Sequence, residues 1–392
     1  MWLNRLLVVL LIVLSGVFAS FYGGNISYAL FYLSIVLPII SFLYTFYVYI
    51  RFRLYQEIGK HVVIKGELTP YSFTIGNEDV ITFNRIKVNF LWDKSTILNG
   101  DSVKEYTILP NTQKTMETMI RCNYRGEYFV GVSSVEIMDF FYLFRITYPV
   151  QSKLKVTVLP RIVYLDHLSL IPSLSDLKRS AYYSIKDKER VDIETRPYQR
   201  GDSKKLIHWK ASAKRAELFS RKLVSDPKQE IVILMDLNSN HINEMDRMIY
   251  EDFAIESTLA IAHYCSEHHT LVHIIYENGS LNHVAIKNPS DFLVFYNMCG
   301  TLLFHSKVPF ERILDESGPR FMDSGYLILV TYSLKNSYLS ILRLQEQGAK
   351  IVVIYISDKE KEEESYIKGL RLSQIAVRII TREDNIMEVL SL

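Results

Sequence analysis

The chain has 392 residues, enough for two or three domains that each bury a core of their own. Its 45 Lys and Arg residues nearly balance 43 Asp and Glu residues, so the chain as a whole is not a polyanion-binding protein. The three cysteines, Cys122, Cys265 and Cys299, have no CxxC spacing. This favours buried thiols in a reducing compartment over a disulfide framework or a zinc site.

Two uncharged apolar runs open the chain, at residues 6–22 and 28–50. Each can form a helix of the ~20 residues that the hydrocarbon core of a membrane requires, and Pro38 is tolerated in such a helix. A cleaved signal peptide is the alternative for the first run. The immediate second run favours a two-helix hairpin, and residues 1–55 are predicted to be a membrane anchor.

Charged residues at the ends of this hairpin predict its orientation. Arg5 precedes it, and Arg51, Arg53 and Lys60 follow it. Under the positive-inside rule both termini are cytoplasmic. The predicted location is the plasma membrane, crossed twice.

Residues 56–165 have the pattern of a β domain. Runs rich in Val, Ile, Thr and Tyr, such as residues 85–92 and 126–138, alternate with Gly, Asn, Asp and Pro. No helical periodicity separates these runs. The pattern predicts an antiparallel β-sandwich.

Residues 166–228 form a basic linker. Between residues 178 and 228 there are 15 Lys and Arg residues against 7 Asp and Glu residues. Anionic lipid is one interpretation of this excess, at about 1 kcal/mol for each basic residue near an anionic leaflet. Nucleic acid is disfavoured, because the segment has one Trp and no aromatic platform.

The other interpretation of this linker is structural. Asp202 is a good N-cap for a helix over residues 203–215, and residues 218–223 alternate as a strand. Arg196, Asp202 and Trp209 would then form a hydrogen-bonded joint, because buried Arg and Asp are expected as partners.

Residues 229–392 alternate between strands and helices. The run from Glu230 to Asp236 reads as a fully buried parallel strand, and residues 245–268 have helical spacing. Further strands are predicted at residues 270–276, 326–331 and 350–356. This alternation predicts a doubly wound α/β domain.

Polar side chains follow the first strand of this domain. Asp236, Asn238 and Asn240 place oxygen atoms at every second position, which can converge on Mg²⁺. The simpler interpretation is that they turn the chain after the strand. Hydroxyl groups at Thr331 and Ser333 follow a later strand. No GxSxG, HExxH, P-loop or GxGxxG motif occurs anywhere in the sequence.

Several motifs together resemble one family, the domain-of-unknown-function-58 family. The main signature lies in the basic linker and is matched by Arg196, Tyr198, Gly201, Asp202, Ile207, Trp209, Ser212, Ala213, Leu218 and Arg221. Residues 124–131 resemble its Arg-Gly-x-Tyr segment, and residues 158–161 resemble its Val-Tyr-Pro-Arg. Residues 139–144 resemble its Asp-Pro-Phe-Gly-Leu-Phe, with Phe140 and Tyr142 in place of the Pro and Gly.

The resemblance implies a von Willebrand factor A-like C-terminal domain and a link to MoxR-type AAA+ ATPases and membrane proteins with transglutaminase-like domains. The metal-dependent adhesion site of that domain usually reads Asp-x-Ser-x-Ser, whereas Asn238 and Asn240 stand at the serine positions here. We therefore expect a non-enzymatic, membrane-anchored adaptor without a cofactor. A Mg²⁺-dependent ligand-binding module is the alternative, and a hydrolase of unrecognised type is a third.

Overall fold

The computed structural model describes residues 1–98, 105–150, 153–170, 194–198, 207–215, 217–222, 230–238, 242–321, 325–358 and 360–391. These form two compact units. One comprises Met1–Arg161 with Cys299–Thr301, and the other comprises Ile162–Met298 with Leu302–Leu392. Most of the basic segment predicted between residues 178 and 228 lies outside the described residues. The predicted four-part division stays a prediction.

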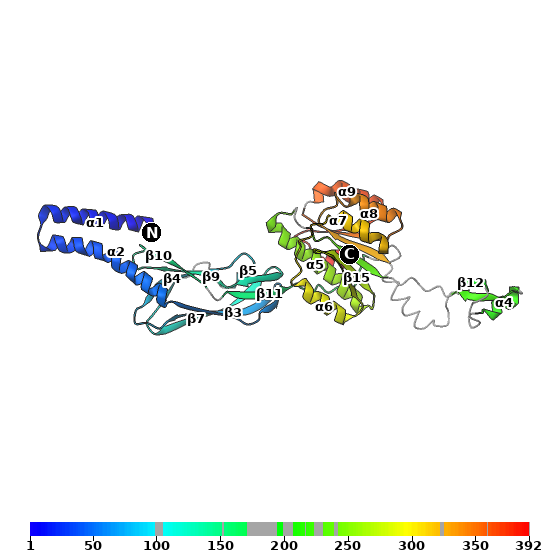
Figure 1. Cartoon of the computed structure of the whole chain (residues 1–392), viewed down its shortest axis with the longest axis horizontal. Coiled ribbons are helices and arrows are strands. Elements are labelled where there is room, and N and C mark those ends of the chain that lie inside the picture. Colours follow the sequence, from blue (N-terminus) through cyan, green and yellow to red (C-terminus); the bar gives the residue numbers. More distant parts are fainter. Residues whose placement is uncertain are drawn as a thin grey trace. The chain divides into compact units, whose positions relative to one another are not determined.

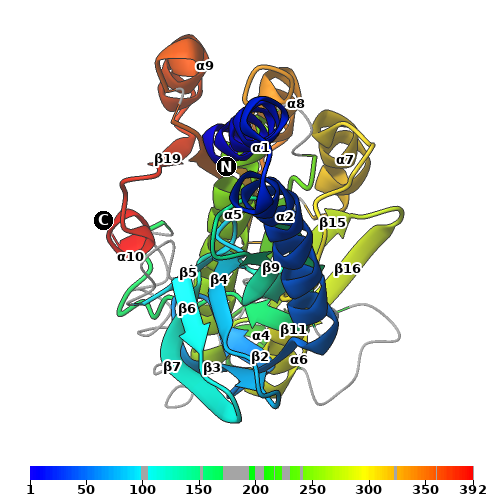
Figure 2. The same cartoon turned by 90° about the vertical axis from the view of Figure 1, so that its left-hand side faces the viewer.

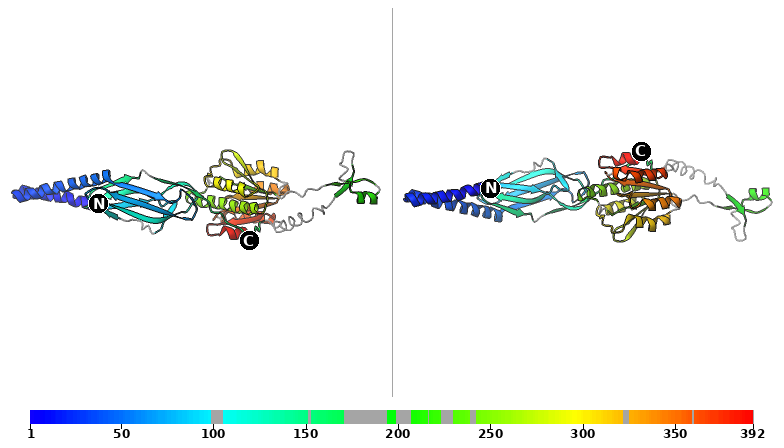
Figure 3. Two further views of the ribbon diagram at one scale, coloured as in Figure 1. Left: turned by 90° about the horizontal axis from the view of Figure 1, so that it is seen from below. Right: turned by 90° about the horizontal axis from the view of Figure 1, so that it is seen from above.

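The first unit begins with a helical hairpin. Helices α1 (Trp2–Tyr22) and α2 (Asn25–Arg51) lie side by side, as Figures 1 and 3 show. The hydroxyl oxygens of Ser15 and Ser34 are 2.9 Å apart between the helices. Both helices are long and apolar enough to cross a membrane, a property that signal sequences share.

The last turns of α2 contact the β domain of the same unit. The Tyr44 hydroxyl donates to the carbonyl of Thr82 at 2.8 Å and accepts from the N–H of Asn84 at 3.0 Å. Arg51 forms two hydrogen bonds with the carboxylate of Asp79, at 2.9 and 3.1 Å. The final part of the second apolar run is therefore bound to the β domain.

The β domain is built from three sheets. Their strand orders are β1-β3-β7-β5, β10-β9-β4-β6 and β2-β11-β8. The strands are β1 (Arg53–Ile58), β2 (Val62–Ile64), β3 (Leu68–Asn77), β4 (Phe83–Phe90), β5 (Ser95–Ile97), β6 (Glu105–Ile108), β7 (Thr112–Cys122), β8 (Gly126–Val130), β9 (Val132–Met138), β10 (Arg145–Pro149) and β11 (Leu154–Leu159). All pairings in the two four-stranded sheets are antiparallel, whereas β11 pairs with β2 in parallel, which differs from the wholly antiparallel prediction.

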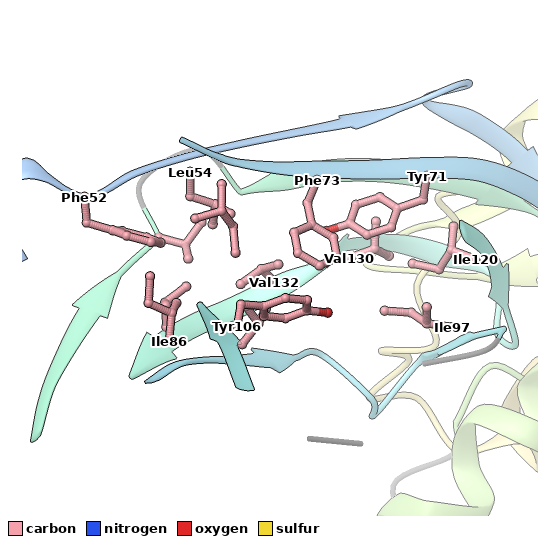
Figure 4. Packing of buried hydrophobic residues seen from close by; sticks show 14 of the residues in the cluster. Phe52, Leu54, Tyr71, Phe73, Ile86, Ile97, Tyr106, Ile120, Val130 and Val132 are labelled. Carbon is pink, nitrogen blue, oxygen red and sulfur yellow. The ribbon is translucent and has the colours of Figure 1, made fainter. Parts of the chain in front are cut away.

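Side chains from both four-stranded sheets share one core. Phe73 on β3 and Ile86 on β4 are almost completely buried there. Val48 and Phe52, at the end of α2, belong to the same core and have no exposed surface. Figure 4 shows Phe52 beside Leu54 at one end of this layer of side chains. The helical hairpin and the β domain are therefore one folded unit.

The second unit contains a six-stranded sheet of order β16-β15-β14-β17-β18-β19. Its strands are β14 (Ile231–Met235), β15 (Val272–Glu277), β16 (Leu281–Ile286), β17 (Tyr326–Thr331), β18 (Ile351–Ile356) and β19 (Ala376–Ile380). All neighbours are parallel except the edge strand β16. Numbered within the sheet this order is 3-2-1-4-5-6, the order of a doubly wound domain.

Helices cover both faces of this sheet. They are α5 (Glu244–Glu267), α6 (Pro289–Cys299), α7 (Phe310–Ser317), α8 (Tyr338–Glu346), α9 (Glu360–Leu372) and α10 (Ile386–Ser391). Val232 and Leu234 on β14 share a core with α7, α8 and α9. Because successive strand residues face opposite ways, Ile233 faces the other layer, where α5 lies (Figures 1 and 2).

Candidate functional site

The carboxyl edge of the six-stranded sheet brings together polar residues from separate strands. Asp236 directly follows β14, and Thr331 ends the neighbouring strand β17. The Thr331 hydroxyl donates to Oδ2 of Asp236 at 3.0 Å, and the N–H of Asn238 donates to Oδ1 at 2.9 Å. Strand order reverses between β14 and β17, and such a reversal is where open α/β sheets bind ligands.

The carboxyl group of Asp236 is almost completely withdrawn from water. Burial raises the pKa of Asp236 from 3.8 to about 7, although the hydrogen bonds from Asn238 and Thr331 lower it. The negative charge of Glu311 adds to the increase. The protein thus holds at this edge an acid that is partly protonated near neutral pH, which is typical of functional sites.

The same edge tests the predicted metal site. Among the described residues, no group of three or more His, Cys, Asp or Glu side chains is arranged to hold a metal ion. Asp236 and Thr331 supply two oxygen donors, and Asn238 is half-buried beside them. Asn240 lies outside the described residues. One buried oxygen of Glu311, Oε2, has no hydrogen-bond partner. These donors fit a cation that keeps several of its own waters, as Mg²⁺ does.

A second buried carboxyl group at this edge was missed by the sequence analysis. Glu277, the last residue of β15, accepts a hydrogen bond from the hydroxyl of Ser306. The N–H of Ser306 in turn bonds to the carbonyl of Leu237, next to Asp236, at 3.3 Å. No motif links Glu277 with Ser306, because they meet only when the loop after α6 returns across the sheet.

The signature segment builds a small β-hairpin with a helix. Strands β12 (Glu194–Pro197) and β13 (Phe219–Lys222) pair antiparallel, and α4 (Trp209–Arg215) lies between them in the sequence. The Ser212 hydroxyl donates to the carbonyl of His208 at 3.1 Å and accepts from the N–H of Phe219 at 2.9 Å. Ser212 therefore ties the helix to the following strand.

The other signature residues differ in how deeply they are buried. Ile207 is buried and bridges to Ser220, and the N–H of Tyr198 bonds to the carbonyl of Leu218 at 2.7 Å. Ala213 is exposed. Arg196 and Arg221 lie on the paired strands β12 and β13. Gly201 and Asp202 lie outside the described residues.

Two details differ from the sequence prediction for this segment. The described helix begins at Trp209, because Ile207 is used in a strand bridge, and the predicted start at residue 203 lies outside the described residues. Trp209 is 67% exposed, whereas the joint hypothesis expected its side chain to face inward. The Arg196–Asp202–Trp209 joint is thus not supported at Trp209.

The second unit is an α/β domain with a polar, partly desolvated edge at the point where its strand order reverses. Residues 194–370 match the family described as "Protein of unknown function DUF58". The match begins at β12 and ends within α9. This part of the chain is therefore similar to that family, as its motifs indicated. A search of the curated proteins found no match.

Several solved structures are similar to parts of the chain. The SpRpn10 VWA domain is 11% identical, with a TM-score of 0.31 over 41% of this chain and 93% of that domain. BatB, a conserved hypothetical protein from Bacteroides thetaiotaomicron, is 11% identical, with a TM-score of 0.29 and the same coverage. A CARDB domain from Pyrococcus furiosus, in complex with di-metal ions, is 16% identical, with a TM-score of 0.18 over 27% of this chain and 91% of that one.

Proposed function

We propose that the protein is a non-enzymatic, membrane-anchored adaptor whose C-terminal domain, of the von Willebrand factor A type, docks a cytoplasmic partner. The β domain, an antiparallel sandwich in its two larger sheets, would act as the stalk. The partner that the family resemblance suggests is a MoxR-type AAA+ ATPase, with a transglutaminase-like membrane protein as a further component. Nucleic acid is not part of this proposal.

The observation that carries the proposal is the joining of the apolar hairpin to the β domain. Within the hydrophobic windows of α1 and α2, only 11% and 17% of the residues are buried by protein. The remaining apolar surface needs a lipid environment. The hydroxyls of Ser15 and Ser34 meet between the helices, and each also bonds to a carbonyl of its own helix, at Ile12 and Phe31, so both polar groups are satisfied within the hairpin.

Contacts at the base of the hairpin favour a retained anchor over a cleaved signal peptide. Asn4 donates to the carbonyl of Phe141 at 2.8 Å, and Arg5 donates to the carbonyl of Leu143 at 2.7 Å. Cleavage after α1 would remove both hydrogen bonds and the contact between Ser15 and Ser34. The folded β domain therefore uses α1.

Orientation is testable by labelling single cysteines in intact cells. The native thiols of Cys122, Cys265 and Cys299 are buried, so they remain silent towards an impermeant maleimide. We expect Ile26→Cys, at the exposed hairpin turn, to be labelled from outside the cell. Leu109→Cys, exposed on the β domain, is expected to react only after permeabilisation. Labelling of Leu109→Cys in intact cells would place the β domain outside and end the partnership with a cytoplasmic ATPase.

The proposed docking site is the carboxyl edge around Asp236 and Thr331. Full-length protein is purified from cells that also produce the MoxR-type ATPase, and the ATPase recovered with it is measured. Asp236→Asn with Thr331→Val is expected to reduce that recovery. Glu230→Gln, at the opposite end of β14, is the matched control. Recovery of no ATPase with the unaltered chain argues against this partner.

The alternative function is a Mg²⁺-dependent ligand-binding module at the same edge. It is favoured by the partnerless Oε2 of Glu311 and by the raised pKa of Asp236, since a cation would relieve both groups. Asp236, Thr331 and Asn238 would hold the ion, and Glu311 would contribute negative charge.

Calorimetry and thermal unfolding of the full chain with Mg²⁺ and Mn²⁺ test this alternative. Heat of binding together with an increase in melting temperature, both lost in Asp236→Ala, is the expected result. An unaltered chain that gives neither heat nor a shift removes the metal site.

A further inference from the structure

A short loop of the β domain lies at the base of the helical hairpin. It runs from Asp139 to Phe144, between strands β9 and β10. Phe140 and Phe141, at its tip, are 49% and 50% exposed. Two adjacent, half-exposed aromatic rings on a β domain are costly in water, so something apolar is expected to cover them.

The depth of this loop is fixed by the first turn of α1. The carbonyl oxygens of Phe141 and Leu143 accept hydrogen bonds from Asn4 and Arg5. These two residues immediately precede the first apolar run, residues 6–22. At 1.5 Å per residue that run is about 25 Å long, close to the thickness of a bilayer's hydrocarbon core. The loop therefore lies where that run begins.

The second helix holds the loop at the same level. Ser41 on α2 donates to the carboxylate of Asp139. The ring of Phe140 lies 4.9 Å from that of Tyr44, and the ring of Phe144 lies 5.4 Å from that of Phe42. Both helices thus contact the loop, α1 through its first turn and α2 about two to three turns before its end.

The loop is also rigid. Asp139 is fully buried and accepts backbone hydrogen bonds from Phe141, Leu143 and Phe144, at 3.0, 2.8 and 2.7 Å. A carboxylate with this many donors fixes the backbone of the turn. The fold itself therefore holds Phe140 and Phe141 in their exposed positions, without a contact to another surface.

We propose that the Asp139–Phe144 loop is a membrane-interface wedge, with Phe140 and Phe141 inserted among the lipid head groups and upper acyl chains beside α1. The wedge seats the β domain on the bilayer surface. Aromatic side chains favour this interface because their rings are apolar and polarisable, and Trp2, 80% exposed at the start of α1, lies at the same end. The inference rests on the proposed membrane anchor.

Fluorescence of a single labelled cysteine tests the wedge. The full chain carrying Phe141→Cys is labelled with an environment-sensitive nitrobenzoxadiazole dye and reconstituted into phosphatidylcholine and phosphatidylglycerol vesicles. The native thiols are buried, and burial raises the pKa of Cys265 and of Cys299 to about 12, so they do not compete for the dye. We expect a blue-shifted emission that lipids carrying a nitroxide near the head group quench strongly.

Two further positions separate the possible outcomes. Phe129→Cys on β8 is the matched control, because Phe129 is 49% exposed, and its dye is expected to show water-like emission without quenching. Leu33→Cys, on α2 about midway between the hairpin turn and the loop contact at Ser41, reports the anchor and is expected to be quenched by nitroxides deep in the acyl chains.

Quenching at position 33 without quenching at 141 overturns the wedge and leaves the anchor standing. Absence of quenching at both positions rejects the anchor, and the wedge with it. A blue-shifted dye at 141 that no lipid nitroxide quenches identifies a protein contact and also overturns the wedge. If Phe141→Cys fails to fold, Phe140→Cys is labelled in its place.

Discussion

Asp236 carries a carboxyl group that folding removes from water. Its pKa is 3.8 in the exposed state and about 7 in the folded protein, so between these pH values the folded chain binds a proton that the unfolded chain has released. Stability from this group is therefore present at low pH and is lost as pH rises from about 4 to 7. Above pH 7 the buried, ionised carboxylate lowers the free energy of unfolding.

Asp236→Asn is expected to remove this cost. At pH 7.5 the variant should be more stable than the unaltered chain by on the order of 1–3 kcal/mol, and the difference should vanish near pH 4. Urea unfolding at a series of pH values measures it. Asp315→Asn, which changes an exposed carboxyl on α7, is the control. A difference that stays constant between pH 4 and 7.5 would contradict the assignment.

Tyr142 occupies a backbone conformation that suits glycine. Its φ is 55°, in the left-handed region, where a Cβ atom costs about 1 kcal/mol. The guanidinium of Arg85 lies 3.7 Å from the centre of the tyrosine ring and offsets part of this strain.

Two substitutions at Tyr142 separate these contributions. Tyr142→Gly and Tyr142→Ala both delete the ring contact, but only glycine relieves the left-handed strain. The glycine variant should be more stable than the alanine variant by about 1 kcal/mol in denaturant unfolding. Equal stabilities, or a more stable alanine variant, would show that the loop relaxes to another conformation.

At the scale of elements, helices α8 and α9 approach closely at one glycine. A Cβ atom on Gly369 would lie 2.3 Å from the hydroxyl oxygen of Tyr338 and 3.1 Å from the ring carbon that carries it. Gly369→Ala is expected to destabilise the second unit by about 1–3 kcal/mol through overpacking, despite the better helix propensity of alanine.

The tyrosine hydroxyl supplies a matched rescue for this pair of helices. Tyr338→Phe removes the atom that clashes, so Gly369→Ala combined with Tyr338→Phe should recover part of the lost stability. A double-mutant cycle in chemical denaturation measures the coupling. A double variant whose loss equals the sum of the two single losses would mean that the helices separate instead of clashing.

The elements that the sequence predicted best are those with continuous patterns. The buried strand before Asp236 and the long helix after it, α5 (Glu244–Glu267), follow directly from apolar runs and helical spacing. Strand β7 (Thr112–Cys122) was missed, because most of its residues are exposed and polar. Helix α7 (Phe310–Ser317) was missed although its buried residues have helical spacing, because the pattern extends over only two turns.

The candidate site was predictable only in part. Asp236 and Thr331 each follow an apolar strand, so their positions at the carboxyl edge could be read from the sequence. That their side chains would be hydrogen-bonded depends on strand order, which spacing does not encode. Glu277 and Ser306 pair through a loop, and Glu311 lies on the short helix α7, whose apolar pattern extends over only two turns.

At the scale of the whole molecule, the end of the second apolar run is part of the β domain's core. The apolar pattern predicted a membrane anchor over residues 1–55. Within that range Phe52, at the end of α2, lies in the β core with no exposed surface, and its ring is 5.1 Å from that of Tyr148. A hydrophobic pattern cannot distinguish lipid from a protein core, because both are apolar.

Native thiols give each unit its own reporter of unfolding. Cys122 is buried in the β core, and Cys265 is buried on α5 of the second unit. In urea, each thiol becomes reactive when its own unit opens, and mass spectrometry of alkylated peptides reads the two separately. Ile341→Ala, a core truncation on α8, is the reciprocal variant and should lower only the urea midpoint for Cys265.

Phe52→Ala decides whether the hairpin is part of the β unit. Truncating a fully buried phenylalanine costs about 3–5 kcal/mol, so the urea midpoint for Cys122 should fall clearly while that for Cys265 stays unchanged. If α2 were an anchor joined only by a linker, Phe52 would support no core and neither midpoint would move. If both midpoints fell together, the two units would unfold as one cooperative body. Only a shift confined to Cys122 agrees with a hairpin that is folded into the β domain, and such a protein has to complete its second helix in order to complete its core.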